Sequence, residues 1–175
     1  MTESREMLQH FLAALAYRTQ KALRGAPESF ADYRAATYAR TPRELVMHMT
    51  SLMGYARTML HGGEYRPEPV ETFADEITRF HAMLGSLRDD FADASLEARI
   101  TDKQFLQGPL SDAMTHAGQL AMLRRLAGSP VASENFIFAK IGAKNVSERQ
   151  ADPVAPDAWW KPDLPPVPAG SPKKE

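Results

Sequence analysis

Residues 110–128 read LSDAMTHAGQLAMLRRLAG and combine helical periodicity with two polar side chains of metal-ligating type. The apolar residues recur at spacings of three and four, which is typical of one face of a helix: Leu110, Ala113, Ala117 and Leu120. Asp112 and His116 are four residues apart, so they share a helix face, and they border this apolar stripe together with Gln119 and Leu123. Unpaired polar groups at the edge of a core cost free energy. The segment therefore predicts a core-lining helix that carries a polar site.

Both ends of this helix are marked in the sequence. The Gly108-Pro109 pair precedes it, so the helix is expected to start near Pro109 or Leu110. Arg124 and Arg125 occupy its last turn, where cations favour the negative end of the helix dipole, and Gly128 and Pro130 follow.

A second helix has the clearest start signal in the chain. Thr41 is placed as its N-cap, Pro42 as its first helical residue and Glu44 as the third residue after the cap, which together form a capping-box pattern. His48 lies beside Leu45 and Leu52 on the apolar stripe of this helix. The helix is expected to end at residues 62–63, which are both glycine.

The remaining pattern predicts an all-α protein with a four-helix bundle over residues 1–130. Further amphipathic helices are expected from Ser4 to Arg24 and from Val70 or Thr72 to about Asp90. The stretch from Ala92 to Gln107 is compatible with a loop, a short strand pair or a helical turn. Residues 131–151 are expected to form a short helical or extended piece that packs on the bundle. Residues 152–175 are expected to form a Pro-rich extended or disordered tail, with Trp159 and Trp160 as the residues that dock it.

Composition excludes several classes of function. With 21 basic and 22 acidic residues the net charge is −1, which provides no basic surface for nucleic acid, so a small molecule or a protein is the expected partner. No cysteine is present, so disulfides, thiolate ligands and a cysteine nucleophile are excluded. No segment approaches the roughly 20 apolar residues of a membrane span. We therefore expect a cytoplasmic protein without membrane contact, and the sequence carries no nucleotide-binding glycine motif.

His48, Asp112 and His116 are the candidate metal ligands. If the two helices pack together, these residues form a two-histidine, one-carboxylate set that suits zinc, iron, nickel or manganese and leaves positions open for water or substrate. Structural roles are also open: Asp112 can offset the helix dipole or pair with His116, and His48 can be a hydrogen-bonded core histidine. Gln119 either orients a ligand of the site or is a solvated helix residue. Among the remaining histidines, His81 is the one that could enter the site.

The run from His116 to Leu120, followed by Leu123, Arg124 and Gly128, resembles the end of the last bundle helix in the DinB/YfiT-like superfamily. The segment with Pro42, Glu44, Leu45, Val46 and His48 resembles that superfamily's first metal-histidine helix.

The resemblance covers about residues 4–130 and implies a bundle with a distinctive connection between helices two and three. It also implies a homodimer and a divalent metal held by three histidines, with His48 as the first ligand and His116 as the third. The middle histidine is replaced here by Asp112. A carboxylate there would lower the Lewis acidity of the ion and favour iron or manganese, or the site would be a vestigial polar pocket.

The expected function is that of a divalent-metal-binding protein, either a metal-dependent hydrolase or a thiol-dependent transferase. In the first case the metal activates water, and in the second it activates a thiol, as the resemblance implies for some superfamily members. The sequence assigns no further catalytic residue and no substrate. The alternative is a non-catalytic helical bundle that dimerises or binds a partner and keeps only a vestigial metal pocket.

Overall fold

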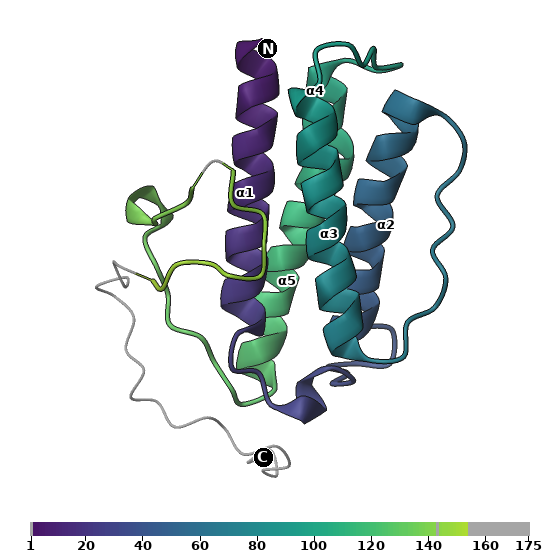
Figure 1. The fold of residues 1–175 in the computed structure, drawn as a ribbon. Coiled ribbons are helices and arrows are strands. Elements are labelled where there is room, and N and C mark those ends of the chain that lie inside the picture. Colours follow the sequence, from purple (N-terminus) through teal and green to yellow (C-terminus); the bar gives the residue numbers. More distant parts are fainter. Residues whose placement is uncertain (1, 143, 154–175) are drawn as a thin grey trace.

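The computed structural model describes residues 2–142 and 144–153, which form a helical bundle (Figure 1). Its four long helices are α1 (Glu3–Leu23), α2 (Pro42–His61), α3 (Phe73–Ala92) and α5 (Ser111–Leu126). The shorter elements are α4 (Asp102–Phe105), a π-helical turn (Leu106–Leu110) and two 3-10 turns (Glu28–Phe30 and Phe136–Phe138). The predicted all-α bundle is confirmed. Among the described residues no helix is long and apolar enough to cross a membrane.

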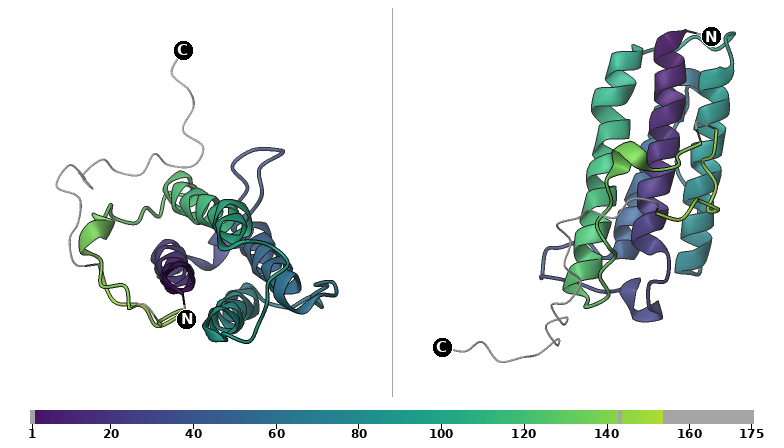
Figure 2. Two further views of the ribbon diagram at one scale, coloured as in Figure 1. Left: turned by 90° about the horizontal axis from the view of Figure 1, so that it is seen from above. Right: turned by 90° about the vertical axis from the view of Figure 1, so that its left-hand side faces the viewer.

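The order of the helices around the bundle brings α2 and α5 side by side. Each of α1 and α2 packs against both α3 and α5, as the view along the bundle shows (Figure 2). Helices α2 and α3 run in the same direction, whereas α1 and α5 run in the opposite one (Figure 1). The neighbours α2 and α5 are therefore antiparallel, and each supplies part of the candidate site.

The start of α2 is fixed by the predicted capping box. The Thr41 hydroxyl accepts from the Glu44 backbone N–H at 3.2 Å, and the Glu44 carboxylate accepts from the Thr41 backbone N–H at 2.7 Å. Helix α3 begins with the same arrangement, formed by Thr72 and Asp75. These caps satisfy N–H groups that have no partner inside the helix, so they define the first turn.

The core lies between the four long helices and contains aromatic, leucine and methionine side chains. Those fully buried include Leu12, Leu15, Phe30, Leu45, Met49, Met53, Phe80, Leu84, Leu87, Phe91 and Phe105. Phe91 and Phe105 meet edge to face, with ring centroids 5.1 Å apart, and so anchor α4 to the end of α3. On α2 the predicted apolar stripe is buried at Leu45, Met49, Ala56 and Leu60, whereas His48 is half-buried at its edge.

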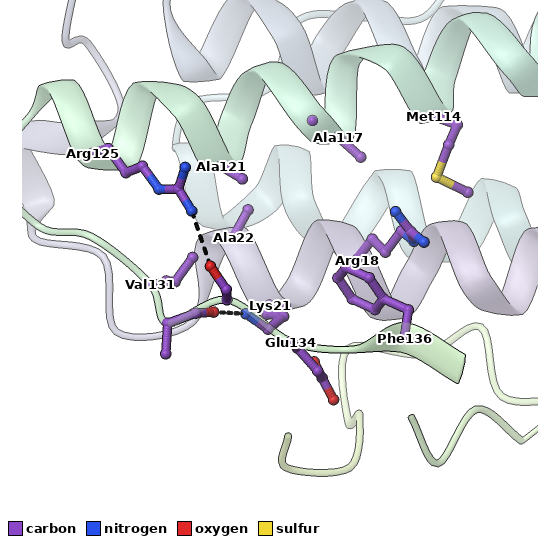
Figure 3. A pocket seen from close by; sticks show the side chains of 13 residues that line it. Arg18, Lys21, Ala22, Met114, Ala117, Ala121, Arg125, Val131, Glu134 and Phe136 are labelled. Atoms are coloured by element: carbon purple, nitrogen blue, oxygen red, sulfur yellow. Dashed lines mark hydrogen bonds between the residues drawn. The ribbon is translucent and has the colours of Figure 1, made fainter. Parts of the chain in front are cut away.

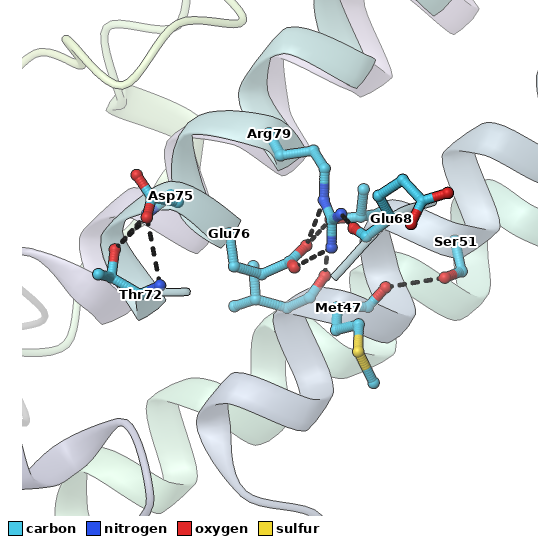
Figure 4. A network of polar contacts seen from close by, with 9 residues as sticks. Met47, Ser51, Glu68, Thr72, Asp75, Glu76 and Arg79 are labelled. Carbon is cyan, nitrogen blue, oxygen red and sulfur yellow. Dashed lines mark hydrogen bonds and ion pairs between the residues drawn. The ribbon is translucent and has the colours of Figure 1, made fainter. Parts of the chain in front are cut away.

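A buried polar contact also joins α2 to α3. The Thr50 hydroxyl donates to a Glu76 carboxylate oxygen at 2.8 Å, and Arg79 pairs with the same carboxylate (Figure 4). Arg79 also donates to the backbone carbonyl of Glu68, in the loop before α3. A buried carboxylate needs such partners, because burying an unpaired charge is costly. The network therefore holds the loop and both helices together.

The long loop between α2 and α3 returns the chain to the other end of the bundle, so that α3 can run parallel to α2 (Figure 1). An extended chain covers about 3.3 Å per residue, so residues 62–72 can span the roughly 30 Å length of a 20-residue helix. The Tyr65 ring lies directly on the backbone of α2 at Gly54. A Cβ atom at Gly54 would be 2.3 Å from the ring carbons of Tyr65, so only glycine allows this contact.

The segment from Ala92 to Gln107, which the sequence left open, contains α4 and the first two residues of the π-helical turn. α5 starts at Ser111 instead of Pro109 or Leu110, because those two residues belong to the π-helical turn. Gly108 departs from helical geometry (φ −93°, ψ −107°), and Pro109 cannot donate a backbone hydrogen bond. The irregular turn therefore sets where α5 begins, and with it the direction of Asp112.

Residues 129–142 and 144–153 pass along α1 and α3 as a mostly extended strap (Figure 2). His81 contacts the Val146 carbonyl at 2.7 Å, and Arg88 donates to the Lys144 carbonyl at 2.8 Å. Among the apolar side chains of this segment, Ile141 packs against the core, whereas Ile137 is 86% exposed. Trp159 and Trp160, with the tail from residue 154, lie outside the described residues.

The contact between Gly54 and Tyr65 gives a test of the fold. Alanine stabilises a helix by about 1 kcal/mol relative to glycine. At Gly118 on α5 nothing lies within 4 Å of an added Cβ, so Gly118→Ala is expected to raise the free energy of unfolding. Gly54→Ala is expected to lower it by about 1 to 3 kcal/mol, because Tyr65 must be displaced. Urea unfolding of both variants measures this difference. Equal stabilisation by the two substitutions would contradict the docking of the loop on α2.

Candidate metal centre

His48 reaches the candidate site from the second turn of α2. The capping box fixes the start of the helix, and His48 then falls on the edge that faces α5. Its side chain is about one-third exposed, so the ring is accessible from solvent while its base packs in the bundle.

Asp112 and His116 come from the first two turns of α5. Asp112 is the second residue of the helix, and its side chain is 48% exposed. His116, one turn further along, is buried, with 8% of the residue exposed. The two side chains share a helix face as the spacing predicts, and Asp112 Oδ1 lies 3.2 Å from His116 Nε2.

The packing of α2 against α5 brings the three predicted residues together. His48 Nε2 lies 3.8 Å from Asp112 Oδ2, and the rings of His48 and His116 are edge to face with centroids 4.8 Å apart. One ligand atom from each of the three residues lies within 4.8 Å of the others. Two nitrogen donors and one carboxylate therefore converge on one point at the seam of two helices.

The His116 ring is oriented by Gln119, one turn later on α5. His116 Nδ1 lies 2.9 Å from the Gln119 side-chain oxygen, which can only accept, so Nδ1 carries the proton. In the neutral ring Nε2 then carries a lone pair. This atom is buried and has no hydrogen-bond partner among the described residues. The Gln119 contact is typical of the group that fixes the tautomer of a metal-binding histidine.

When the His116 ring is neutral, its arrangement with Asp112 is unfavourable without a cation. The Nε2 lone pair faces a carboxylate oxygen at 3.2 Å, so two electron-rich atoms approach each other at the edge of the core. A divalent cation between them would convert this repulsion into two favourable contacts.

The electrostatic surroundings keep His48 in the form that can bind a metal. Burial lowers the pKa of His48 below its usual range, and the positive charge of Arg40 and the neighbouring His116 ring lower it further. Asp112 acts in the opposite direction, and its effect is smaller. The ring of His48 is therefore neutral near pH 7, with a nitrogen lone pair available.

The other histidines are placed elsewhere. His81 does not join the site, because its ring contacts Gln20 on α1 and the Val146 carbonyl in the strap. His61, at the end of α2, lies 3.0 Å from Asp90 Oδ1, and His10 on α1 is exposed. Arg124, interpreted from the sequence as matching the helix dipole, is buried and donates to the Ala22 carbonyl at 2.9 Å.

The cavities of the described residues include one beside α5 and one beside the start of α2. The first, of about 340 Å³, is bounded by α1, α5 and the strap (Figure 3). Its cationic side chains bind the strap: Lys21 donates to the Ala132 carbonyl, Arg125 to the Ser133 hydroxyl, and the Arg18 guanidinium lies 3.8 Å from the Phe136 ring centroid. We interpret this cavity as the seam where the strap docks.

The second cavity, of about 390 Å³, opens beside His48. The segment before α2 contributes Tyr38 and Arg40 to its lining, and neither residue was predicted from the sequence to belong to a site. That segment has no helical or strand periodicity, so its contact with the site depends on tertiary packing alone.

Comparisons with models of protein families, with curated proteins and with solved structures find no match for this chain. Membership in the DinB/YfiT-like superfamily therefore stays a prediction from the two sequence segments. The case for a metal centre rests on the positions of the side chains.

The contact between Gln119 and His116 can be tested without any metal. At alkaline pH, ¹⁵N NMR of the wild-type protein is expected to show His116 with a protonated Nδ1 and an unprotonated Nε2. Gln119→Leu removes the acceptor and is expected to give a mixture of tautomers, whereas Gln119→Glu retains an acceptor and should keep the wild-type pattern. A protonated Nε2 in the wild type would contradict the assignment.

Proposed function

We propose that this protein binds a divalent metal ion through His48, Asp112 and His116 and uses it as a metal-dependent enzyme. The observation that carries the proposal is the buried Nε2 lone pair of His116, which faces the Asp112 carboxylate at 3.2 Å and has no hydrogen-bond partner in the described part of the chain. His48 supplies the third donor from the opposite helix.

The donor set fits a metal ion in chemistry and in spacing. Imidazole nitrogens and carboxylate oxygens bind zinc and similar ions at about 2.0–2.2 Å, so ligand atoms around one ion lie roughly 3 to 3.5 Å apart. The distance of 3.2 Å from Asp112 Oδ1 to His116 Nε2 is within this range, and the distance of 3.8 Å from Asp112 Oδ2 to His48 Nε2 is slightly longer. One ligand atom from each residue lies within 4.8 Å of the others, so the side chains would move closer together around an ion. A small rotation of the half-exposed Asp112 side chain would bring its carboxylate closer to His48.

Two histidines and one carboxylate favour particular metals. Zinc accepts this set in catalytic sites, and iron(II) occurs in sites with two histidines and one carboxylate on one face of the ion. Asp112 adds a negative charge that three neutral histidines would lack, which supports iron or manganese beside zinc and nickel.

The metal ion and the residues around it would have separate roles in such a site. A bound metal ion would supply Lewis acidity, which lowers the pKa of water or of a thiol and so produces a nucleophile near neutral pH. Gln119 holds the His116 ring with Nε2 toward Asp112. Because Asp112 and His48 are partly exposed, water and a substrate can reach the site from the solvent side.

A hydrolase using metal-activated water and a transferase using a metal-activated thiol both agree with this arrangement. The sequence resemblance supports the thiol-dependent reaction, and the open solvent side supports access of water as well. A small-molecule substrate, a homodimeric state and a cytoplasmic location belong to the same proposal, and they rest on the sequence and its resemblance.

Metal analysis of the purified, untagged protein tests the proposal. We expect wild-type protein loaded with zinc, iron(II), nickel or manganese and then dialysed to retain about one ion per chain, measured by plasma mass spectrometry. His48→Ala, Asp112→Ala and His116→Ala should each lose most of it, since each removes one of three ligands. His10→Ala, which removes an exposed histidine of α1, is the matched control and should retain the wild-type amount.

Circular dichroism should show the same helix content in all four variants, so that loss of metal is separated from loss of fold. A wild-type protein that retains none of the four metals would contradict the proposal and favour a non-catalytic bundle with a vestigial pocket. Retention of metal by His116→Ala at the wild-type level would place the metal elsewhere.

A further inference from the structure

The cavity beside His48 has the features of a small-molecule site. It lies between the segment before α2 and the first turns of α2, and its volume of about 390 Å³ is within the range of sites for small ligands. Its wall includes the ring of His48, so a molecule bound there would be adjacent to the candidate metal centre. The full lining is Arg34, Tyr38, Ala39, Arg40, Glu44, Met47, His48 and Ser51.

The charges in this cavity leave one cation uncompensated. Arg34 is bound to the Glu44 carboxylate at 3.1 Å and to the Ala39 carbonyl at 2.5 Å, so it holds the segment in place. Glu44 also accepts from the Thr41 backbone N–H in the capping box. Arg40 is exposed and makes no hydrogen bond or ion pair with any described residue. The positive charge of Arg40 is close enough to His48 to act on it electrostatically.

The same cavity presents apolar surface. Tyr38 is 99% exposed, and Met47, from the outer face of α2, is exposed as well. Both side chains are therefore free to contact the apolar part of a molecule bound in the cavity.

We propose that this cavity binds a small carboxylate with an apolar or aromatic body, with Arg40 holding the carboxylate and Tyr38 and Met47 covering the apolar part. A guanidinium forms two parallel hydrogen bonds with a carboxylate, which fixes the orientation of the ligand. One uncompensated guanidinium matches a monoanion better than a phosphate dianion. That such a carboxylate is the substrate of the enzyme rests on the proposed function, whereas anion binding by Arg40 can be measured without metal.

Calorimetric titration with benzoate tests the site, with benzamide as the neutral analogue and phenyl phosphate as the dianion. Each probe is added to wild-type protein, both treated with EDTA and loaded with zinc, and to the variants Arg40→Gln and Arg43→Gln. Arg43 is the matched control, because it lies three residues away and pairs with Asp32 outside the cavity.

Benzoate is expected to bind wild type and Arg43→Gln equally and to bind Arg40→Gln about 10- to 100-fold more weakly, the range for a lost charge-assisted hydrogen bond. Benzamide should also bind wild type at least about 10-fold more weakly than benzoate. Arg40-dependent binding in the EDTA-treated protein, with no retained zinc, would support the anion site while the metal proposal fails.

The inference is overturned if benzoate binds neither form of the wild-type protein, if Arg40→Gln binds it as wild type does, or if benzamide binds equally well. Tighter, Arg40-dependent binding of phenyl phosphate would replace the carboxylate by a phosphate ester as the ligand class.

Discussion

The antiparallel packing of α2 against α5 is the contact on which the candidate site depends. Each helix supplies an incomplete set of donors, one histidine from α2 and a carboxylate with a second histidine from α5. A shift of one residue in either helix would turn a side chain by about 100° and separate the three groups. The site therefore requires that the start of both helices be fixed, and the two starts are fixed by different means.

Helix α2 is fixed by local chemistry, and α5 by its tertiary surroundings. The Thr41–Glu44 capping box determines the first turn of α2. α5 instead follows the irregular π-helical turn over Leu106–Leu110, anchored through buried Phe105. Gly108 departs from helical geometry within this turn, so the chain bends between α4 and α5. Here the turn delivers Asp112 to the first turn of α5, directly opposite His48.

The parts of the site that could be predicted from the sequence are those with a local sequence signal. The cap of α2, the end of α5 and the shared face of Asp112 and His116 follow from spacings within single segments. Their approach to His48 could be proposed only on the assumption that the two helices pack together. Three features arise from contacts between segments distant in the sequence or from an unusual turn: the docking of Tyr65 on Gly54, the π-helical turn, and the position of Arg40 beside His48.

The long loop between α2 and α3 gives the bundle its particular arrangement. It makes these helices parallel and leaves α2 free to pack against α5 on its other side. The sequence resemblance implied a distinctive connection at this point, and the structure has a long crossover there. The departure from three histidines to two histidines and Asp112 would give this chain a site of different charge from that of the family it resembles.

The most direct test of the account is a crystal structure of the metal-loaded protein with anomalous scattering measured at the absorption edge of the metal. We predict one anomalous peak between α2 and α5, about 2.0–2.2 Å from His48 Nε2, His116 Nε2 and an Asp112 oxygen. A peak held by other residues, or none between these helices in protein shown to contain the metal, would contradict it.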